Sequence, residues 1–412
     1  MATLKDRKIM KKVYLDYNAT TPIDPRVFEA MIPYMKEEFG NPSSIHSYGR
    51  AGKAALDNSR EQIAELLGAR AKEIVFTSCG SESNNFAIKG IAFLLREKGN
   101  HLITTQVEHA SVLETFGFLE SQGFRVTYLG VDKYGLIDFG ELREAITDDT
   151  ILVSVMFANN ETGVIMPIEE IAGIVKEKGV IFHTDAIQAV GKLDINLKNL
   201  PVDLLSLSGH KLYGPKGVGA LFVRTGVGAR HGVSLQPLIH GGGQERGKRS
   251  GTENVAGIVG FGKACEIFKE DAGYKMRDAR IKELRDELYE GISERISGLK
   301  LNGHPEKRLS NTLNLSFEGV EGESLVMNLD IEGIAVSTGS ACSEGNVEPS
   351  HVLLAMGLSK EQAVSSLRFS PGRFTSKEDI YRVLEVLPGV VERVREIRSV
   401  ETPLMASLHD KK

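Results

Sequence analysis

Seven short apolar runs recur between positions 74 and 223, and this pattern constrains the fold more than any other feature of the chain. Most are apolar along their whole length, whereas a strand with one solvated face alternates between apolar and polar residues. Such runs are typical of strands buried on both faces of a largely parallel sheet. The predicted strands are 74–77, 101–105, 125–129, 151–157, 180–183, 203–207 and 220–223.

Helix signals separate several of these runs. Asp24 followed by Pro25 indicates an N-cap and a first helical residue, and Ser111 with Glu114 indicates a capping box at the start of a helix that stops at Gly123. This alternation predicts an α/β fold with a mostly parallel seven-stranded sheet covered by helices. Such sheets bind ligands beyond the carboxyl ends of their strands, so polar residues that follow strands are the candidates for a site.

The character of the sequence changes near Asp271, where a long charged amphipathic stretch begins. A strand-like run at 312–317 and two further helix signals follow it. We therefore expect a large domain over residues 22–270 and a smaller α+β domain formed by residues 1–21 together with 271–412.

The composition excludes several classes of protein. The 50 basic and 55 acidic residues give a net charge of -5, so the chain lacks the overall positive charge of a nucleic-acid-binding protein. No run approaches the roughly 18 apolar residues of a membrane-spanning helix, and the start has no apolar signal segment. The 3 cysteines form no C-x-x-C pair, which argues against a disulfide framework and favours a reducing compartment, by default the cytoplasm.

Two polar residues follow neighbouring apolar runs. Lys211 comes after a buried run and the small residues 208–210, and Asp185 comes directly after another run. A desolvated lysine can form a Schiff base with an aldehyde, and an acidic residue can keep a pyridine nitrogen protonated. The pair thus suits pyridoxal phosphate, although taken alone Lys211 could be a solvated loop residue and Asp185 a helix N-cap.

Two glycine-containing segments could bind phosphate. Residues 77–84 combine a strand, a turn of small residues and a helix start, where backbone amides form an anion site; an ordinary strand-to-helix loop is the alternative. Residues 242–248 fit part of a P-loop, but Arg249 stands where the magnesium-binding serine or threonine belongs. Nucleotide binding at this second segment is therefore the weaker hypothesis.

The three cysteines have different surroundings. Cys342 lies among small, flexible residues that cannot bury it, which favours an exposed thiol able to ionise and attack. Cys265 lies in an apolar helical pattern and is interpreted as a core residue. For Cys79 two interpretations stay open: the helix N-terminus could lower the pKa of its thiol, or the residue packs beside the phosphate turn.

Arg368 and His109 are weaker candidates. Arg368 stands between apolar neighbours, which suits either a carboxylate clamp or a structural salt bridge. His109 follows a strand and could stack on a flat cofactor and transfer protons, or be merely structural.

Together these segments resemble the cysteine desulfurases of the NifS and IscS type, which belong to the class V aminotransferase superfamily of fold type I pyridoxal-phosphate enzymes. The resemblance covers nearly the whole chain. It is carried by residues 14–22, Asn-Asn-Glu-Thr-Gly at 159–163, Ser-Gly-His-Lys at 208–211, Arg-Ser-Gly-Thr at 249–252 and the cysteine loop at 337–346.

The resemblance implies a role for each of a set of residues. Lys211 holds the cofactor aldehyde, Asp185 pairs with the pyridine nitrogen, and His109 stacks on the ring and takes part in catalysis. Gln188 and Asn160 contact ring substituents, while the phosphate is bound by Gly80, Ser81, Ser208 and His210. Arg368 binds the substrate carboxylate beside Asn18 and Asn160, and Cys342 accepts the sulfur as a persulfide.

The resemblance also implies partners. Thr252 reaches the phosphate of the neighbouring subunit's cofactor, which implies a homodimer, and an iron-sulfur scaffold protein of the IscU or NifU type is the expected sulfur acceptor, with tRNA thiolation as a further outlet. Cys342 would then be a candidate shared ligand of an iron-sulfur cluster. A selenocysteine lyase, a class V transaminase, a sulfur-relay partner and a non-catalytic nucleotide-binding assembly factor are the alternatives.

Overall fold

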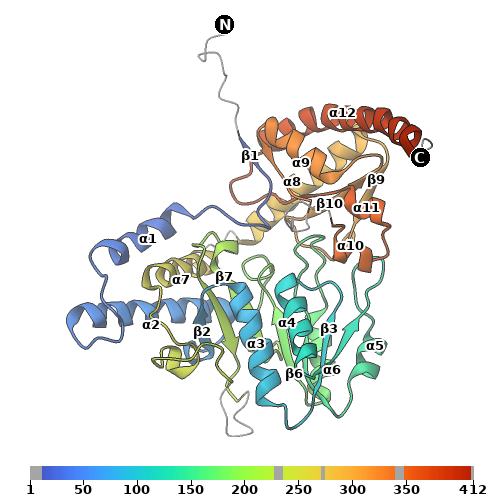
Figure 1. The fold of residues 1–412 in the computed structure, drawn as a ribbon. Helices are drawn as coiled ribbons and strands as arrows, with labels where there is room; N and C mark the ends of the chain where they lie inside the picture. Colours follow the sequence, from blue (N-terminus) through green and yellow to red (C-terminus); the bar gives the residue numbers. More distant parts are fainter. Residues whose placement is uncertain (1–11, 227–234, 271–273, 339–347, 410–412) are drawn as a thin grey trace.

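The computed structural model describes residues 12–409 except 227–234, 271–273 and 339–347 (Figure 1). Cys342, the predicted sulfur acceptor, falls in the last of these gaps and therefore lies outside the described residues. The two halves of the molecule lie one above the other in Figure 1, with the large sheet below and the C-terminal elements above.

A seven-stranded sheet forms the centre of the larger half, with the strand order β2-β8-β7-β6-β5-β3-β4. Neighbouring strands are parallel except at β8, which is antiparallel to both β2 and β7. The strands are β2 (Ile74–Thr77), β3 (His101–Thr105), β4 (Arg125–Leu129), β5 (Thr150–Ser154), β6 (Ile181–Asp185), β7 (Leu204–Ser208) and β8 (Gly219–Val223). The predicted α/β fold with a mostly parallel seven-stranded sheet is confirmed.

Both faces of this sheet are covered, as the wholly apolar runs predicted. In β2, Ile74 and Phe76 enter one hydrophobic core and Val75, between them, enters the core on the opposite face. The helices that accompany the sheet are α1 (Pro25–Lys36), α2 (Ser47–Leu67), α3 (Gly80–Leu94), α4 (Ala110–Ser121), α5 (Phe139–Ala145), α6 (Ile168–Glu177) and α7 (Val255–Glu270). Figure 1 shows α1, α2 and α7 side by side as an arm at one edge of the sheet.

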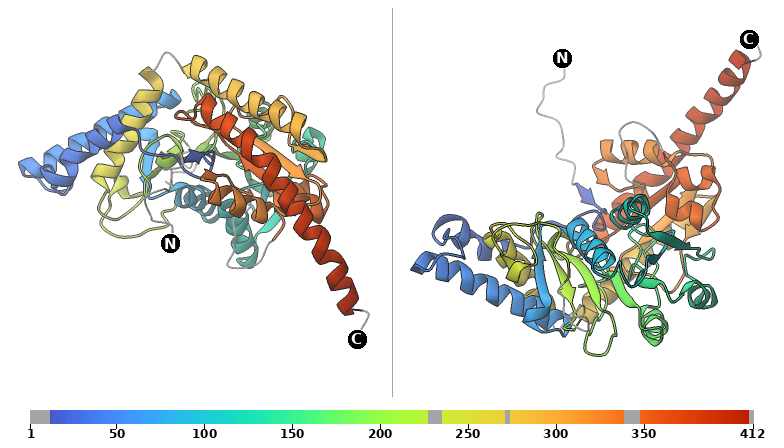
Figure 2. Two further views of the ribbon diagram at one scale, coloured as in Figure 1. Left: turned by 90° about the horizontal axis from the view of Figure 1, so that it is seen from above. Right: turned by 60° about the horizontal axis from the view of Figure 1, so that its bottom comes forward.

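The C-terminal half combines an antiparallel sheet with helices around a second core. Its elements are α8 (Tyr274–Arg295), β9 (Leu299–Asn302), β10 (Leu313–Phe317), α9 (Gly322–Ile331), β11 (Ile334–Ala335), α10 (His351–Ala355), α11 (Lys360–Val364), β12 (Ser366–Phe369) and α12 (Lys377–His409). The strand β1 (Val13–Tyr14) pairs with β11, so this N-terminal segment belongs structurally with the C-terminal half. Figure 2 shows the end of α12 extending away from the body.

The start of α4 differs from the prediction. His109, not Ser111, is the N-cap, and its Nδ1 accepts a hydrogen bond from the Ser111 amide at 3.1 Å. An imidazole nitrogen can serve the same purpose as the serine hydroxyl, so the helix begins two residues earlier than the capping box indicated. The Asp24 cap is confirmed, because its side chain accepts from the amide of Arg26. The domain boundaries at 22 and 270 stay a prediction.

Candidate active site

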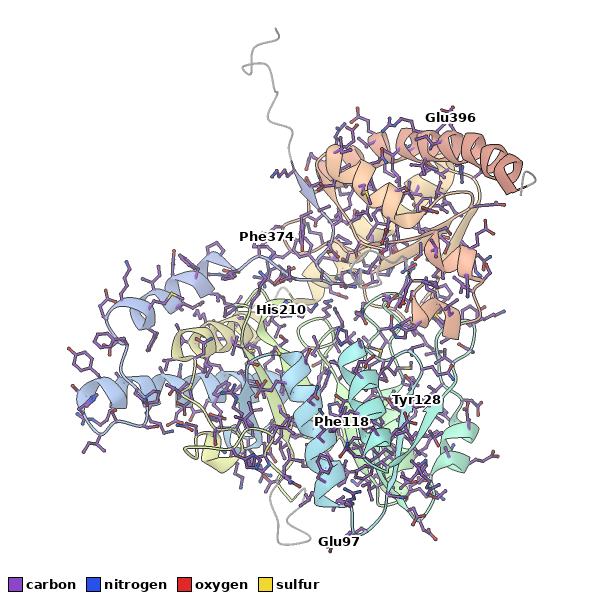
Figure 3. All side chains as sticks on the ribbon, in the orientation of Figure 1. Glu97, Phe118, Tyr128, His210, Phe374 and Glu396 are labelled. Atoms are coloured by element: carbon purple, nitrogen blue, oxygen red, sulfur yellow. The ribbon has the colours of Figure 1, made fainter. Side chains whose placement is uncertain are left out.

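The carboxyl ends of β6 and β7 lie next to each other at the edge of the sheet that faces the C-terminal half. Asp185 is the last residue of β6 and pairs with Ser206 of β7. Immediately after β7, a short 3-10 helix (Gly209–Lys211) turns the chain toward the N-terminal segment. In Figure 3, His210 lies at this end of the sheet, between the two halves. The fold therefore brings together Asp185, Ser208, His210 and Lys211, as predicted.

The amine of Lys211 is held by backbone. Its Nζ donates to the carbonyl oxygens of Asn18 at 2.5 Å and of Ala19 at 2.7 Å. Burial, followed by the positive charge of Arg368, lowers the pKa of Lys211 to about 8. The neutral, nucleophilic form of this amine is therefore accessible near physiological pH, as attack on an aldehyde requires.

A chain of hydrogen bonds connects Asp185 to His109. Asn84, on α3, donates to Asp185 Oδ2 at 2.7 Å and to Ser111 Oγ at 2.9 Å. The Ser111 hydroxyl lies 2.8 Å from His109 Nδ1, which also accepts the amide of Ser111. Because Nδ1 accepts this hydrogen bond, the neutral imidazole ring of His109 carries its proton on Nε2. The aspartate and the histidine, predicted as separate contacts to one ring, are thus oriented by a shared pair of side chains.

Glu108 was not predicted as a site residue, yet it lies next to His109 and is fully buried. Its Oε1 accepts from Thr105 Oγ1 at 2.9 Å and from the amide of Met156 at 2.8 Å. Burial raises its pKa to about 8. Glu108 is therefore protonated at neutral pH and adds no negative charge near Asp185.

Three of the four predicted phosphate ligands, Gly80, Ser81 and Ser208, lie at the N-terminus of α3. Ser208 Oγ is buried and has no hydrogen-bond partner among the described residues. Gly80 opens α3, and a Cβ added there would clash with Ile187 and lie 3.6 Å from the Cβ of Ser208. His210 is uncharged at neutral pH, because burial lowers its pKa to about 4, and Ser81 is exposed in the first turn. An unsatisfied hydroxyl, a side-chain-free helix start and a neutral imidazole fit a phosphate group.

Asn18 connects several segments of the site. Its Nδ2 donates to Asn160 O and Thr312 Oγ1, and its Oδ1 accepts from Lys192 Nζ at 3.0 Å and from Asn311 Nδ2 at 2.9 Å. Its backbone carbonyl accepts from Gln188 Nε2 at 2.9 Å. Asn18, Asn160 and Gln188 are thus brought together, as predicted.

Lys192 is a second, half-buried lysine of the site, and it was not predicted from the sequence. Burial, followed by the charges of Lys211 and Arg368, lowers the pKa of Lys192 well below its ordinary value. Its spacing of four residues from Gln188 is the only sequence signal, and it is far too common to be informative.

The arginine predicted as carboxylate clamp lies in β12. Arg368 donates from Nη1 to Asn160 O at 2.9 Å and from Nη2 to Asp16 Oδ1 at 2.8 Å. Its Nε is buried without a hydrogen-bond partner among the described residues. Asp16 was not predicted as a site residue, although it provides the carboxylate that pairs with this guanidinium.

Thr252 is not joined to this group of residues. It is exposed and lines a separate cavity with Thr77 and Ser78. The glycine-rich segment around it does not form a P-loop, because Lys248 is followed by an irregular stretch and the next helix begins only at Val255. The geometry therefore does not support the nucleotide-binding alternative.

The described residues contain neither a membrane-spanning helix nor a cluster of metal-binding side chains. No helix there is both long and apolar enough to cross a membrane. No group of three or more His, Cys, Asp or Glu side chains in that part of the chain could hold a metal ion. The predicted cluster ligand, Cys342, lies outside it.

Comparison with known proteins gives consistent matches. The aminotransferase class-V family model matches residues 13–383. The chain is 52% identical over 387 residues to the cysteine desulfurase IscS of Dictyoglomus turgidum, covering 94% of this chain and 96% of that protein. It is 54% identical to the cysteine desulfurase IscS of Methanosarcina thermophila, covering 94% of each.

Solved structures agree with this. A NifS-like protein matches with a TM-score of 0.85 and 39% identity over 92% of this chain and 99% of the other. A structure described as SspA in complex with cysteine matches with a TM-score of 0.76 and 43% identity over 87% of this chain and 98% of the other.

Proposed function

The chain belongs to the class-V aminotransferase family and is a pyridoxal-phosphate-dependent cysteine desulfurase, and we propose that Lys211, Arg368 and Cys342 carry its reaction on L-cysteine. The observation that supports this assignment best is the half-buried Lys211, whose amine has a pKa lowered to about 8 and shares one hydrogen-bond network with Asn18 and Gln188. A lysine in that state is suited to holding an aldehyde.

The residues around Lys211 would hold the cofactor. Asp185, oriented by Asn84, would pair with the pyridine nitrogen, and His109 would cover the ring. Gln188 and Asn160 would contact ring substituents, and the phosphate would be bound by Gly80, Ser81, Ser208 and His210. When bound, the cofactor supplies an electron sink for the charge that forms at the substrate α-carbon.

The remaining residues would act on the substrate. Arg368 binds the carboxylate of L-cysteine, with Asn18 and Asn160 beside it, and Lys211 or His109 moves the α-proton. The Cys342 thiolate attacks the substrate sulfur, so that a bond between the two sulfurs forms while the bond from that sulfur to the substrate Cβ breaks. The electron pair of the broken bond stays with the substrate carbon, and Cβ gains a proton to become the methyl group of alanine. The products are alanine and a persulfide on Cys342.

The wider context is also a proposal. We infer that the persulfide sulfur passes to an iron-sulfur scaffold protein of the IscU or NifU type in the cytoplasm, with Cys342 a candidate shared cluster ligand, and that transfer toward tRNA thiolation is a further outlet. We also infer a homodimer in which Thr252 contacts the partner's cofactor phosphate. The exposure of Thr252 supports this.

The test is incubation of the purified protein with L-cysteine and a reductant, with alanine, sulfide and keto acid measured together. Equal yields of alanine and sulfide are expected, whereas keto acid would indicate a transaminase. A parallel incubation with selenocysteine tests the alternative that the protein is a selenocysteine lyase.

Two variants separate the proposed roles. Lys211→Ala should lose both the cofactor absorbance and the activity. Cys342→Ala should keep the absorbance and lose alanine formation, and full alanine formation by Cys342→Ala would refute the role of Cys342.

A further inference from the structure

Lys192 occupies an unusual place for a lysine with no assigned role in the reaction. The preceding Gly191 has a positive φ of 76°, and a Cβ there would clash with Leu212 and lie 3.3 Å from Phe268. The chain can therefore pass closely against these two residues, and Lys192 and Lys211 both line a small cavity of about 50 Å³.

The contacts of Lys192 are two amide carbonyls. Its Nζ donates to Gln188 Oε1 at 2.7 Å and to Asn18 Oδ1 at 3.0 Å. A side-chain amide has an accepting and a donating end, and a 180° flip exchanges them at little steric cost. A lysine that donates to the carbonyl end thus selects one of the two orientations.

The selected orientation directs the donating end of Gln188 toward the reactive lysine. Gln188 Nε2 donates to Asn18 O, the same carbonyl that accepts from Lys211 Nζ. Asn18 Oδ1 would still have Asn311 as a donor without Lys192, whereas Lys192 is the only donor to Gln188 Oε1 among the described contacts. Gln188 therefore depends on Lys192 more than Asn18 does.

We propose that Lys192 is a positioning residue that fixes the side-chain amide of Gln188 with its N–H groups toward Lys211, and so determines how tightly the site binds pyridoxal phosphate. The inference rests on the proposed role of Gln188 as a cofactor contact. Lys192 acts through Gln188 and does not itself touch the cofactor.

The experiment measures the dissociation constant of the full-length apoprotein for pyridoxal phosphate by equilibrium dialysis. Lys192→Met should raise this constant about five- to tenfold, the range expected for one lost hydrogen bond. Lys192→Gln, which is uncharged but can still donate to Gln188, should stay within about twofold of the unmodified protein. Lys198→Met, at an exposed position six residues along, should have no effect.

A double-mutant cycle tests whether Lys192 acts through Gln188. In a Gln188→Leu background, adding Lys192→Met should change the dissociation constant by less than about twofold, because the amide it positions is gone. Lys192→Met and Gln188→Leu should also move the pH midpoint of the bound cofactor's absorbance in the same direction. A merely structural role would not reproduce this shared spectral shift.

Several outcomes would overturn the proposal. If the effects of Lys192→Met and Gln188→Leu on the dissociation constant were fully additive, Lys192 would act directly and not through Gln188. If Lys192→Gln bound pyridoxal phosphate as weakly as Lys192→Met does, the role of Lys192 would be purely electrostatic. Should Lys192→Met fail to fold, Lys192→Leu, which also cannot donate a hydrogen bond, replaces it in both backgrounds with the same expected changes. If Lys211→Ala retained the cofactor absorbance, the proposed function would fail instead, independently of Lys192.

Discussion

The ionisation of single residues decides how the site can react. Burial and the charge of Arg368 lower the pKa of Lys211 to about 8 from 10.5. Between these two values its amine is neutral in the folded apoprotein, whereas an exposed lysine is still protonated. We predict that the rate at which cyanoborohydride traps pyridoxal on Lys211, followed by mass spectrometry of the peptide, rises through a midpoint near pH 8.

The same experiment carries its own controls. Arg368→Met removes the second cause of the lowered pKa, so the midpoint for Lys211 should move to higher pH. The exposed Lys198 in the same digest is the internal reference, because it is not buried as Lys211 is. A Lys211 midpoint equal to that of Lys198 would show that burial does not control this amine.

The sequence identified those site residues that follow strands, because the carboxyl edge of a parallel sheet can be located from the pattern alone. Asp185, Ser208 and Lys211 belong to this group. It missed Asp16, Glu108 and Lys192, whose properties depend on burial and on distant contacts. Asp16 pairs with Arg368 across 352 positions, and no local pattern reports such a pair. The roles of all these residues stay predictions.

At the scale of elements, the apolar runs predicted the strands almost residue by residue, since full burial leaves a clear pattern. Three predicted strands match β2, β3 and β4, whereas 151–157 overshoots β5, which ends at Ser154. Val155 and Met156, just beyond Ser154, are still buried and apolar. The apolar pattern therefore did not indicate where β5 stops pairing with its neighbouring strands. Helix starts were less predictable, because a histidine caps α4 in place of a typical residue.

One helix offers a simple gain in stability. Gly117 lies inside α4, and a Cβ added there would meet no atom within 4 Å. Gly117→Ala should raise the thermal midpoint of the apoprotein, because alanine in a helix is favoured by about 0.5–1 kcal/mol. Gly163→Ala should lower it, since Gly163 has a φ of 77° and its Cβ would press on Thr312. A rise in both variants would contradict this reasoning.

The glycine-rich segment is fixed by a buried ion pair. Glu245, whose side chain is 3% exposed, accepts from both Nη atoms of Arg60 at 2.7 Å and from the amide of Phe76 at 2.8 Å. Glu245 and Arg246 both have positive φ, a strained backbone that these contacts hold in place. The segment that carries Thr252 is therefore anchored to α2 and β2.

Glu245→Gln should destabilise the protein by about 3–5 kcal/mol, because it leaves the buried Arg60 without a counter-charge. Asp57→Asn is the matched control, since it breaks the exposed pair with Lys53 and should cost less than about 1 kcal/mol. Urea denaturation followed by circular dichroism measures both variants. Equal losses would mean that burial of the Glu245 pair has no energetic consequence.

For the whole molecule, the central question is how the two halves are held together around the site. Asn18 is 1% exposed, and its side chain is bonded to both halves. It bonds to Asn160 O and Lys192 Nζ near the large sheet, and to Thr312 Oγ1 and Asn311 Nδ2 next to β10. Removing its side chain leaves several buried groups unsatisfied, at about 1–3 kcal/mol each. Coupling between the halves should weaken as a result.

We therefore predict that Asn18→Ala lowers the thermal midpoint of the apoprotein and broadens or divides its calorimetric transition, because the two hydrophobic cores can then unfold separately. The exposed Asn199→Ala should leave the transition unchanged. The lost side-chain bonds also include one from Lys192 Nζ, so Lys192→Met should reproduce a small part of the effect. A single transition in Asn18→Ala, as sharp as that of the unmodified protein, would mean that apolar contacts mainly couple the two halves. The arrangement of the site would then depend more on the packing between the halves than on the hydrogen bonds of Asn18.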